Sequence, residues 1–465
     1  MSWETVIGLE VHTELATATK LFCGCRNEFG SEPNTNVCAV CMGLPGSLPV
    51  LNRRAVELAM RIGTALQCSV VPSIFHRKNY FYPDMPKDYQ ISQYDEPINI
   101  DGRLELADGS QVGIVRAHIE EDTGKTTHAG ATGRIHGADH SLVDYNRAGV
   151  PLVEIVSEPD IRSADQAKAY VSELRSILVA TGASDGKMEE GSLRIDANVS
   201  VRPSGSSELG TRCEVKNMNS LRSLARAVEY EATRQIALLE AGEAVAQETR
   251  HWDENEGRTH SMRSKEEAFD YRYFPEPDLV PVEPSDEWLS SVVASIPLLP
   301  AARRVRLADV VGVSTAEVAL VVEKGLDELV LDAVEAGADG RAALTHAEQN
   351  VTGPVDAAAF ARLVTLQVEG AVTPTQAKAV LAEMQETGAS PDDIAKAHGF
   401  EAMSDDALAA VVEETLAAHP DETARLRAGD QSLIGFFVGE VMRATRGKAS
   451  GKVVTSLLRQ RAGLG

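Results

Sequence analysis

Alternating apolar and polar positions predict several β-strands in the first 220 residues. In the clearest run, residues 5–15, one face is apolar apart from a threonine, and the other face carries only side chains that can ligate a cation. The first face comprises Leu9, Val11, Thr13 and Leu15, and the second comprises Glu10, His12 and Glu14. The same spacing recurs in 110–120, 187–202 and 210–220. We therefore expect an antiparallel sheet with one face on the core, while the other is either solvated or a cradle for cations and phosphates.

Helical periodicity replaces this alternation in three segments of the same region. The predicted helices span 52–66, 163–181 and 220–242, and their capping residues are Asn52, Ser163 with Gln166, and Asn219 or Ser220.

The prolines of 269–284 mark a boundary, and from Trp288 onward the pattern is helical with almost no strand signal. Helices are expected near 300–310, 314–324, 326–337, 340–351 and 355–369, and a further set begins at Thr373. The last 60 residues read as short helices with a break at His419-Pro420. The predicted fold class is therefore α+β, with a sheet-containing domain followed by helical ones.

The stretch 118–128, HIEEDTGKTTH, places three acids, Glu120, Glu121 and Asp122, directly after a predicted strand, and Lys125 follows. Crowded acids repel one another unless solvent, cations or a metal offset their charge. The stretch is either a solvated acidic turn or one wall of a metal site.

Glu154 is the strongest single-residue anomaly in the first half of the chain. It stands inside the apolar sequence Pro-Leu-Val-Glu-Ile-Val of the run 141–156. A carboxylate on a mostly buried strand costs several kcal/mol unless it is paired or ligates a metal.

The loop 76–98 is aromatic and broken by prolines. Its tyrosines and phenylalanine lie close in sequence to Arg77, Lys78 and Lys87. The loop either packs against a core or forms a pocket wall that stacks a base and meets phosphates.

Four of the six cysteines, Cys23, Cys25, Cys38 and Cys41, fall within nineteen residues, as C-x-C and C-x-x-C pairs. In a reducing cytosol this spacing predicts a structural Zn²⁺ site; free or redox-active thiols are the alternative. Cys68 and Cys213 are isolated and read as ordinary buried thiols.

The net charge of -24 argues against a chain that coats nucleic acid by bulk charge. Residues 441–465 nevertheless hold six basic residues and no acid: Arg443, Arg446, Lys448, Lys452, Arg459 and Arg461. This local patch is either a solubilising tail or a contact with a phosphate backbone.

Several motifs are excluded. Gly124-Lys125-Thr126 resembles the end of a P-loop, but Ile119 stands where the first glycine is required. There is no dinucleotide-binding fingerprint and no amidase-type nucleophile motif. The sequence shows no run of about 18 apolar residues and no signal-peptide pattern, so we expect a cytoplasmic protein that does not cross a membrane.

Six motifs together resemble the GatB/GatE family of the tRNA-dependent amidotransferases. They are VIGLEVHTEL, RKNYFYPDMPKDYQISQ, HIEEDTGKTTH, NRAGVPLVEIVSEPDIRS, KMEEGSLRIDANVS and DYRYFPEPD. The resemblance covers residues 1 to about 290 with long motifs, and extends with weaker ones over the helical remainder. It implies a cradle domain with a core similar to glutamine synthetase and ATP-dependent kinases over 1–292, a helical domain over 293–405, and a YqeY-like, tRNA-binding tail over 406–465.

The resemblance also implies the activity. In this family ATP phosphorylates the side-chain carboxylate of Glu misacylated onto tRNA(Gln), or of Asp on tRNA(Asn), and ammonia converts the product to an amide. The implied class is a glutamine-hydrolysing carbon-nitrogen ligase, EC 6.3.5. The expected partners are an amidase (glutaminase) subunit, which supplies the ammonia through a channel, a small third subunit in a heterotrimer, the tRNA, and the matching non-discriminating aminoacyl-tRNA synthetase.

The site residues follow residue by residue from the resemblance. Glu10, His12, Glu121 and Glu154 match positions that surround Mg²⁺ in the family and carry the catalysis. Lys78, Lys125 and Arg194 are candidates for phosphate contacts with ATP, chosen by charge and position. The four clustered cysteines match the family's structural Zn²⁺ site.

The alternative is a stand-alone ligase of the glutamine-synthetase type that uses free ammonia. It shares the metal cradle but leaves the helical remainder and its basic end unexplained.

Overall fold

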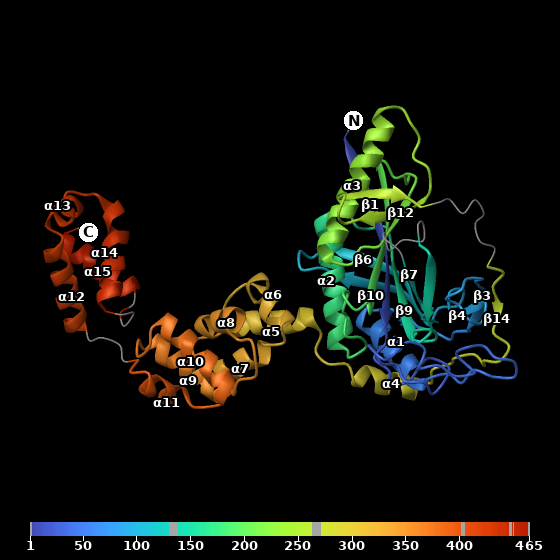
Figure 1. The fold of residues 1–465 in the computed structure, drawn as a ribbon, viewed down its shortest axis with the longest axis horizontal. Coiled ribbons are helices and arrows are strands. Elements are labelled where there is room, and N and C mark those ends of the chain that lie inside the picture. Colours follow the sequence, from blue (N-terminus) through green and yellow to red (C-terminus); the bar gives the residue numbers. More distant parts are fainter. Residues whose placement is uncertain are drawn as a thin grey trace. The chain divides into compact units, whose positions relative to one another are not determined.

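The computed structural model describes residues 2–129, 138–262, 271–400, 405–445, 449 and 451–463. The chain divides into two compact units, Met1–Pro300 and Ala301–Gly465 (Figure 1). No helix among the described residues has the length and apolar character needed to cross a bilayer.

A large twisted sheet forms the N-terminal unit, and four long strands make its centre: β10 (Leu193–Pro203), β1 (Trp3–Glu14), β9 (Pro151–Ser157) and β6 (Gln111–Glu121). One flank continues through β11 (Cys213–Lys216), β12 (Thr249–Asp253) and β13 (Arg258–Ser261). The other continues from β6 through β4 (Tyr89–Ser92), β3 (His76–Asn79) and β14 (Phe274–Pro275), while β5 (Asn99–Glu105) also pairs with β6, and β2 (Ser69–Val70) with β5. The pairing is antiparallel, as expected, except that β11 and β12 run parallel. The fold class is α+β.

The apolar face of the sheet packs on three helices: α1 (Arg53–Ala65), α2 (Ala164–Ala180) and α3 (Leu221–Glu240). Leu9 and Val11 are fully buried there, whereas Glu10 and His12 on the opposite face are half-buried. Figure 1 shows α2 and α3 side by side along the sheet. The alternation in the sequence therefore separates a core face from a polar face.

Helix capping follows the sequence with one difference. Asn52 accepts a hydrogen bond from the Arg54 N–H at 2.9 Å, and Ser163 from the Gln166 N–H at 3.1 Å. The Gln166 side chain accepts from the Arg162 N–H, one residue before the cap, so the expected reciprocal capping box is incomplete. Helix α3 begins after Ser220.

The acidic stretch is not a turn. Strand β6 continues to Glu121, and the exposures of Glu120, Glu121 and Asp122 are 5%, 1% and 4%. The chain then forms β7 (Lys125–Ala129), which pairs with β8 (His140–Asp144) in a separate two-stranded sheet. The run expected over 141–156 is thus two strands, β8 and β9, that belong to different sheets.

Helix α4 (Asp286–Ala294) ends the first unit, and the second unit is helical throughout its described part. Its helices are α5 (Pro300–Val311), α6 (Thr315–Glu323), α7 (Asp327–Glu335), α8 (Gly340–Gln349), α9 (Ala357–Val368), α10 (Pro374–Thr387), α11 (Pro391–Ala397), α12 (Asp405–Ala418), α13 (Pro420–Arg427), η1 (Gln431–Leu433), α14 (Ile434–Ala444) and α15 (Gly451–Ala462). Two separate apolar clusters hold them together. One extends from Leu307 to Ala395 and the other from Leu408 to Ala462.

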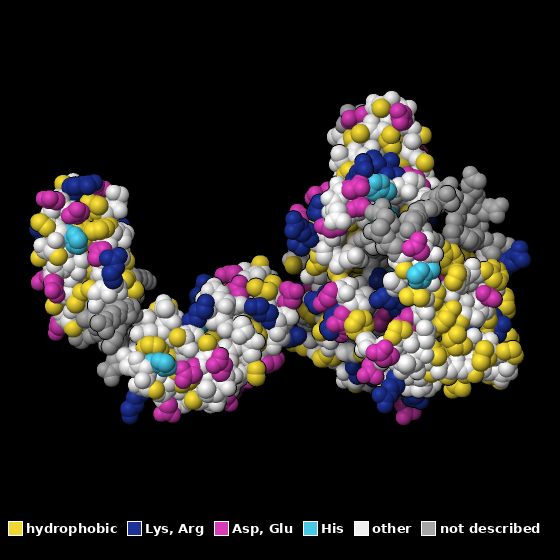
Figure 2. Space-filling model, in the orientation of Figure 1, with side chains coloured by type: hydrophobic (Ala, Val, Ile, Leu, Met, Phe, Trp, Pro, Cys, Tyr) yellow, Lys and Arg dark blue, Asp and Glu magenta, His cyan; other side chains and the backbone are white. Residues whose placement is uncertain are grey.

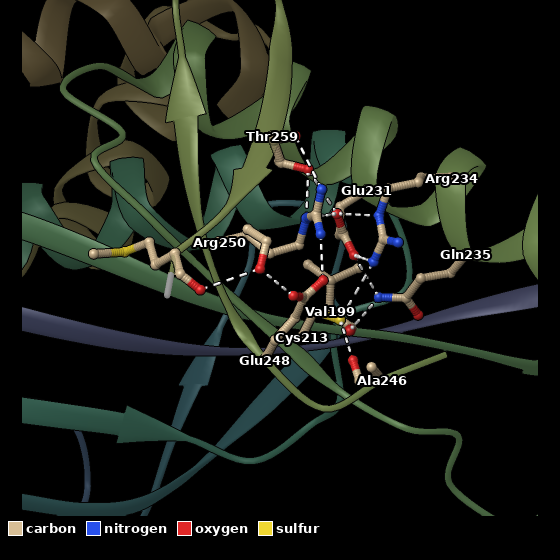
Figure 3. A network of polar contacts seen from close by, with 11 residues as sticks. Val199, Cys213, Glu231, Arg234, Gln235, Ala246, Glu248, Arg250 and Thr259 are labelled. Atoms are coloured by element: carbon tan, nitrogen blue, oxygen red, sulfur yellow. Dashed lines mark hydrogen bonds and ion pairs between the residues drawn. The ribbon is translucent and has the colours of Figure 1, made fainter. Parts of the chain in front are cut away.

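A buried polar network joins α3 to the flank of the sheet (Figure 3). Glu231 of α3 is fully buried and accepts hydrogen bonds from Arg234 Nη2 at 2.6 Å and from Gln235 Nε2 at 2.9 Å. Arg250 of β12 approaches the same carboxylate at 3.3 Å, and Thr259 of β13 donates to it at 2.9 Å. Glu231 is therefore the common acceptor that ties one helix to two strands.

We predict that Glu231→Gln lowers the free energy of unfolding by about 3–5 kcal/mol, because it leaves two buried guanidinium groups without their carboxylate. The three tryptophans, Trp3, Trp252 and Trp288, all lie in the N-terminal unit, so urea denaturation followed by tryptophan fluorescence reports this unit. Glu229→Gln, at an exposed position of the same helix, is the control and should change the stability by less than about 0.5 kcal/mol. Equal stability of both variants would contradict the role of Glu231.

Candidate functional site

Four neighbouring strands place polar side chains in one row across the open face of the sheet. His118 of β6 lies opposite Glu154 of β9 in the strand register. Glu154 in turn lies opposite His12 of β1, and His12 lies opposite Arg194 of β10. Side chains directly opposite in antiparallel strands share a face and have Cβ atoms about 5 Å apart. The row therefore brings these side chains together from segments far apart in the sequence.

His12, Glu120 and Glu154 form a compact group of possible metal ligands, with one ligand atom from each within 4.8 Å of the others. His12 Nε2 lies 3.6 Å from Glu154 Oε2 and 3.8 Å from Glu120 Oε1. Two carboxylates and one imidazole are a donor set that suits Mn²⁺ and accommodates Mg²⁺ with water as further ligands. The residues thus fit a divalent cation, and they include two of the four ligands expected from the sequence.

Glu121, by contrast, lies on the other side of the sheet. Adjacent residues of a strand point to opposite faces, and Glu120 is the one that faces His12. Glu121 accepts hydrogen bonds from Lys87 Nζ and, at 2.9 Å, from the Ile91 backbone N–H. The buried Lys87–Glu121 pair occupies that carboxylate. The expectation of a Glu121 ligand is corrected: Glu120 takes that position.

His118 belongs to the row but was not among the residues predicted from the sequence. Its side chain is fully buried, and neither ring nitrogen has a hydrogen-bond partner. Its Nε2 lies 3.6 Å from Glu154 Oε2 and 3.8 Å from Glu120 Oε2. A buried imidazole without partners is costly, so a nitrogen left open beside two carboxylates fits a site that holds a cation. The two-residue spacing of His118 and Glu120 on a strand could have revealed it.

Glu10 lies at the edge of this group. It stands opposite Asp196 of β10, and its Oε1 accepts a hydrogen bond from Asn198 Nδ2 at 2.9 Å. Burial and the charge of Glu154 raise the pKa of Glu10 above its usual range. Glu10 therefore adds an acid next to the group without being one of its three clustered ligands.

The electrostatics of the group depend on the histidines. Burial opposes the charge of His12, but its interactions with Glu154 and Glu120 outweigh burial and raise the pKa of His12 to about 9. Burial likewise opposes the charge of Glu154, yet His118, His12 and Arg116 lower its pKa well below the usual range. In the metal-free protein at neutral pH, a proton on His12 therefore balances part of the acid charge.

An open cleft of about 870 Å³ lies above this face, and its lining includes His12, Glu120, Lys78, Arg194 and Lys216. Arg194 Nη2 lies 2.8 Å from Asp122 Oδ2, and Lys216 Nζ lies 2.7 Å from Asp196 Oδ2. Figure 2 shows acidic and basic side chains close together in a hollow of the N-terminal unit. Cations beside a carboxylate group make the cleft suitable for phosphates held near a metal.

Lys125 does not share this location. It is exposed on β7, opposite Asp144 of β8, and is not among the residues that line the cleft. Lys216, which the sequence placed on the polar face without a role, lines the cleft instead.

The four cysteines Cys23, Cys25, Cys38 and Cys41 converge, with their Sγ atoms all within 4.8 Å of one another. Cys38 Sγ and Cys41 Sγ are 3.9 Å apart. A tetrahedral Zn²⁺ with Zn–S distances of about 2.3 Å separates its sulfurs by about 3.8 Å. The donor set and spacing therefore fit a structural Zn²⁺.

Lys20 supplies a positive charge beside these thiols. Its side chain is fully buried, and Nζ donates to the Tyr145 carbonyl at 3.3 Å. Hydrogen bonds from the Cys23 thiol and the Cys38 N–H, together with the charge of Lys20, lower the pKa of Cys41 to about 5. The surroundings thus favour the thiolate that a metal requires.

Comparison with known proteins relates both units to one family. Residues 5–290 match the profile of the GatB/GatE catalytic domain, and residues 339–461 match that of the GatB domain. A protein of Nocardia farcinica is 52% identical, with 98% of this chain and 95% of that protein covered. Proteins of Mycobacterium tuberculosis and Thermobifida fusca are 50% and 48% identical, covering 100% and 99% of this chain and 95% and 94% of their own lengths. All three are named as the GatB-type subunit of an aspartyl/glutamyl-tRNA(Asn/Gln) amidotransferase.

We predict that Mn²⁺ binding to this chain strengthens as pH rises from about 6.5 toward the His12 pKa of about 9. A protonated imidazole cannot ligate a metal, so below its pKa each pH unit should change the apparent affinity by up to about tenfold. Titration of free Mn²⁺ by electron paramagnetic resonance measures this. His12→Gln should bind Mn²⁺ more weakly and with a flatter pH profile. A wild-type affinity independent of pH would show that His12 is not a ligand.

Proposed function

Because this chain belongs to the GatB/GatE family, we propose that it is the subunit that forms the amide on misacylated tRNA in a glutamine-hydrolysing, tRNA-dependent amidotransferase. The matches extend over nearly the full length of curated relatives, and those relatives are named for this activity. The enzyme class is a carbon-nitrogen ligase of EC 6.3.5. The stand-alone glutamine-synthetase-type ligase has no comparable support.

The reaction we assign has two steps. The γ-phosphoryl group of ATP passes to the side-chain carboxylate of Glu on tRNA(Gln) or Asp on tRNA(Asn), which gives an acyl phosphate and ADP. Ammonia then attacks the acyl carbon, the C–O bond to phosphate breaks, and the products are the amide and inorganic phosphate. The observation that carries this assignment is the His118–Glu154–His12 row with Glu120, set under a cleft lined by cations.

His12, Glu120 and Glu154 would hold Mg²⁺, with Glu10 and His118 beside them. Bound there, the ion neutralises charge on the transferred phosphoryl group. Burial of the three ligands keeps them in a fixed arrangement, because each is held by a strand of the sheet. We retain Glu10 as a supporting acid and replace Glu121 by Glu120.

Lys78, Arg194 and Lys216 are the cations we assign to phosphate contacts. The acids now paired with Arg194 and Lys216 hold these two side chains toward the cleft. Phosphate oxygens would compete for the same donors, and charge-assisted hydrogen bonds favour such an exchange.

The Zn²⁺ that we propose for the four cysteines is structural. It would close the loop 20–50 on itself, and Lys20 would offset part of the thiolate charge. The same loop exposes apolar side chains: Phe29, Leu44, Leu48 and Val50 are 54–75% exposed. Figure 2 shows yellow side chains gathered at the lower right of the unit, where Figure 1 draws this loop and β14. Exposed apolar surface supports a protein partner.

We propose that the partners are the amidase subunit and the small third subunit in a cytoplasmic heterotrimer, together with the tRNA and the non-discriminating aminoacyl-tRNA synthetase. We also propose three functional domains: the cradle over 1–292, a helical domain over 293–405 and a tRNA-binding tail over 406–465. The two separate apolar clusters of the helical unit support its division.

The basic end of the tail is less free than its sequence suggests. Arg443 pairs with Glu440 at 2.7 Å, and Arg461 pairs with Glu413 at 2.9 Å. Arg459 lies in the last turn of α15, whereas Arg446 and Lys448 fall outside the described residues. Lys452 lies in the first turn of the same helix. A tRNA contact by the tail therefore has to displace some intramolecular ion pairs.

We predict that Glu154→Gln lowers the ATP-dependent formation of Gln-tRNA(Gln) by at least about 100-fold, since it removes one charge that positions the metal. The assay uses this chain reconstituted with the amidase-type partner, Glu-tRNA(Gln), ATP and glutamine. Glu158→Gln, at an exposed position just beyond β9, is the matched control and should retain activity within about twofold.

Full activity of Glu154→Gln would reject the metal assignment. If free glutamate and ammonia are converted as well as Glu-tRNA(Gln), the stand-alone ligase is the correct function.

A further inference from the structure

One wall of the cleft is aromatic. Tyr80, just beyond β3, and Tyr271, at the start of the segment that leads into β14, both line it and are half-buried. The Asn79 N–H donates to the Tyr271 carbonyl at 3.0 Å, and Asn79 Nδ2 donates to the same oxygen at 2.8 Å. Two segments almost 200 residues apart are therefore fastened together at this wall.

Further rings support this wall from behind. Tyr80 stacks on Tyr82 with ring centroids 5.7 Å apart. Tyr271 meets Tyr273 edge-on at 5.9 Å, and Tyr273 stacks on Tyr94 at 5.4 Å. Neighbouring rings restrict each other's rotamers, so the two lining rings are held in place before a ligand arrives.

The wall stands next to the proposed phosphate site. Lys78 Nζ lies 4.8 Å from the ring centroid of Tyr271. Burial and nearby charges, including the acid Asp84, raise the pKa of Tyr80 to about 12, so its ring stays neutral. Across the cleft lie Lys216 and Arg194, and His12 and Glu120 also line it. Neutral rings on one wall and cations on both sides match a ligand with a flat base and a chain of phosphates.

We propose that Tyr80 and Tyr271 form a stacking site for the adenine base of an adenosine that is bound at the phosphoryl-transfer site. Two substrates of the proposed function present this chemistry: ATP, and the 3′-terminal adenosine of the tRNA. The inference deepens the proposed function and rests on it. Stacking on one aromatic ring is sequence-tolerant and changes affinity by roughly 5- to 150-fold on alanine substitution.

Leucine variants of both tyrosines test the stacking, because leucine keeps an apolar side chain and removes the ring. Tyr80→Phe and Tyr271→Phe keep the ring and should bind like the wild type. Phe81→Leu is the matched control, since Phe81 is 77% exposed and does not line the cleft. Thermal denaturation of each variant in the reconstituted complex checks its folding.

Binding is measured on the reconstituted complex with two pairs of probes. The first pair is a non-hydrolysable ATP analogue and inorganic tripolyphosphate, each with Mg²⁺. The second pair is uncharged tRNA(Gln) and the same tRNA without its 3′-terminal adenosine. We expect Tyr271→Leu and Tyr80→Leu to weaken the base-bearing probe of one pair by about tenfold, and to leave the probe without the base unchanged. The pair that responds identifies the source of the adenine.

Unchanged binding of both base-bearing probes would overturn the proposal, as would an equal loss for the probes with and without the base. A wild-type complex that binds nucleotide and forms Gln-tRNA(Gln), with variants that bind equally well, rejects only the stacking site. A wild-type complex without transamidation rejects the proposed function, and the stacking site with it.

Discussion

A carboxylate buried in the middle of a sheet is the constraint on which this structure depends. Glu154 sits on a central strand with apolar neighbours along the chain, and it is stable there only because the adjacent strands bring histidines to both sides. Antiparallel register fixes this arrangement: once β1, β9 and β6 pair to bury their apolar faces, His12 and His118 must lie next to Glu154. The same pairing that builds the core thus builds the candidate metal site.

The two faces of β6 show how one strand serves both purposes. Glu120 points to the cleft, and Glu121 points to the opposite side, where Lys87 neutralises it. Cys41 and Glu121 line one small pocket on that second side, so the cysteine loop lies against the underside of the strand that carries Glu120. A loop held by Zn²⁺ would therefore brace the strand from below while the cleft binds substrate from above.

Sequence alternation predicted the polar face, the core face and the main helices, because a period of two or of 3.6 is a local property of the chain. It did not resolve Glu120 from Glu121, since that choice depends on where β6 ends, and β6 extends one residue further than the pattern indicated. His118 was missed because its value lies in its cross-strand partner. The aromatic wall was anticipated only as one alternative for the loop 76–98; Tyr271 joins it through long-range pairing of β14 with β3, which composition does not reveal.

Anomalous diffraction from crystals of the complex soaked in Mn²⁺ tests the central claim most directly, because it locates the ion without depending on turnover. The account predicts a peak on the cleft side of β6, within about 2.5 Å of ligand atoms of His12, Glu120 and Glu154. A peak beside Glu121 on the other side of the sheet, or an occupied Mn²⁺ site elsewhere with none at this row, would contradict it.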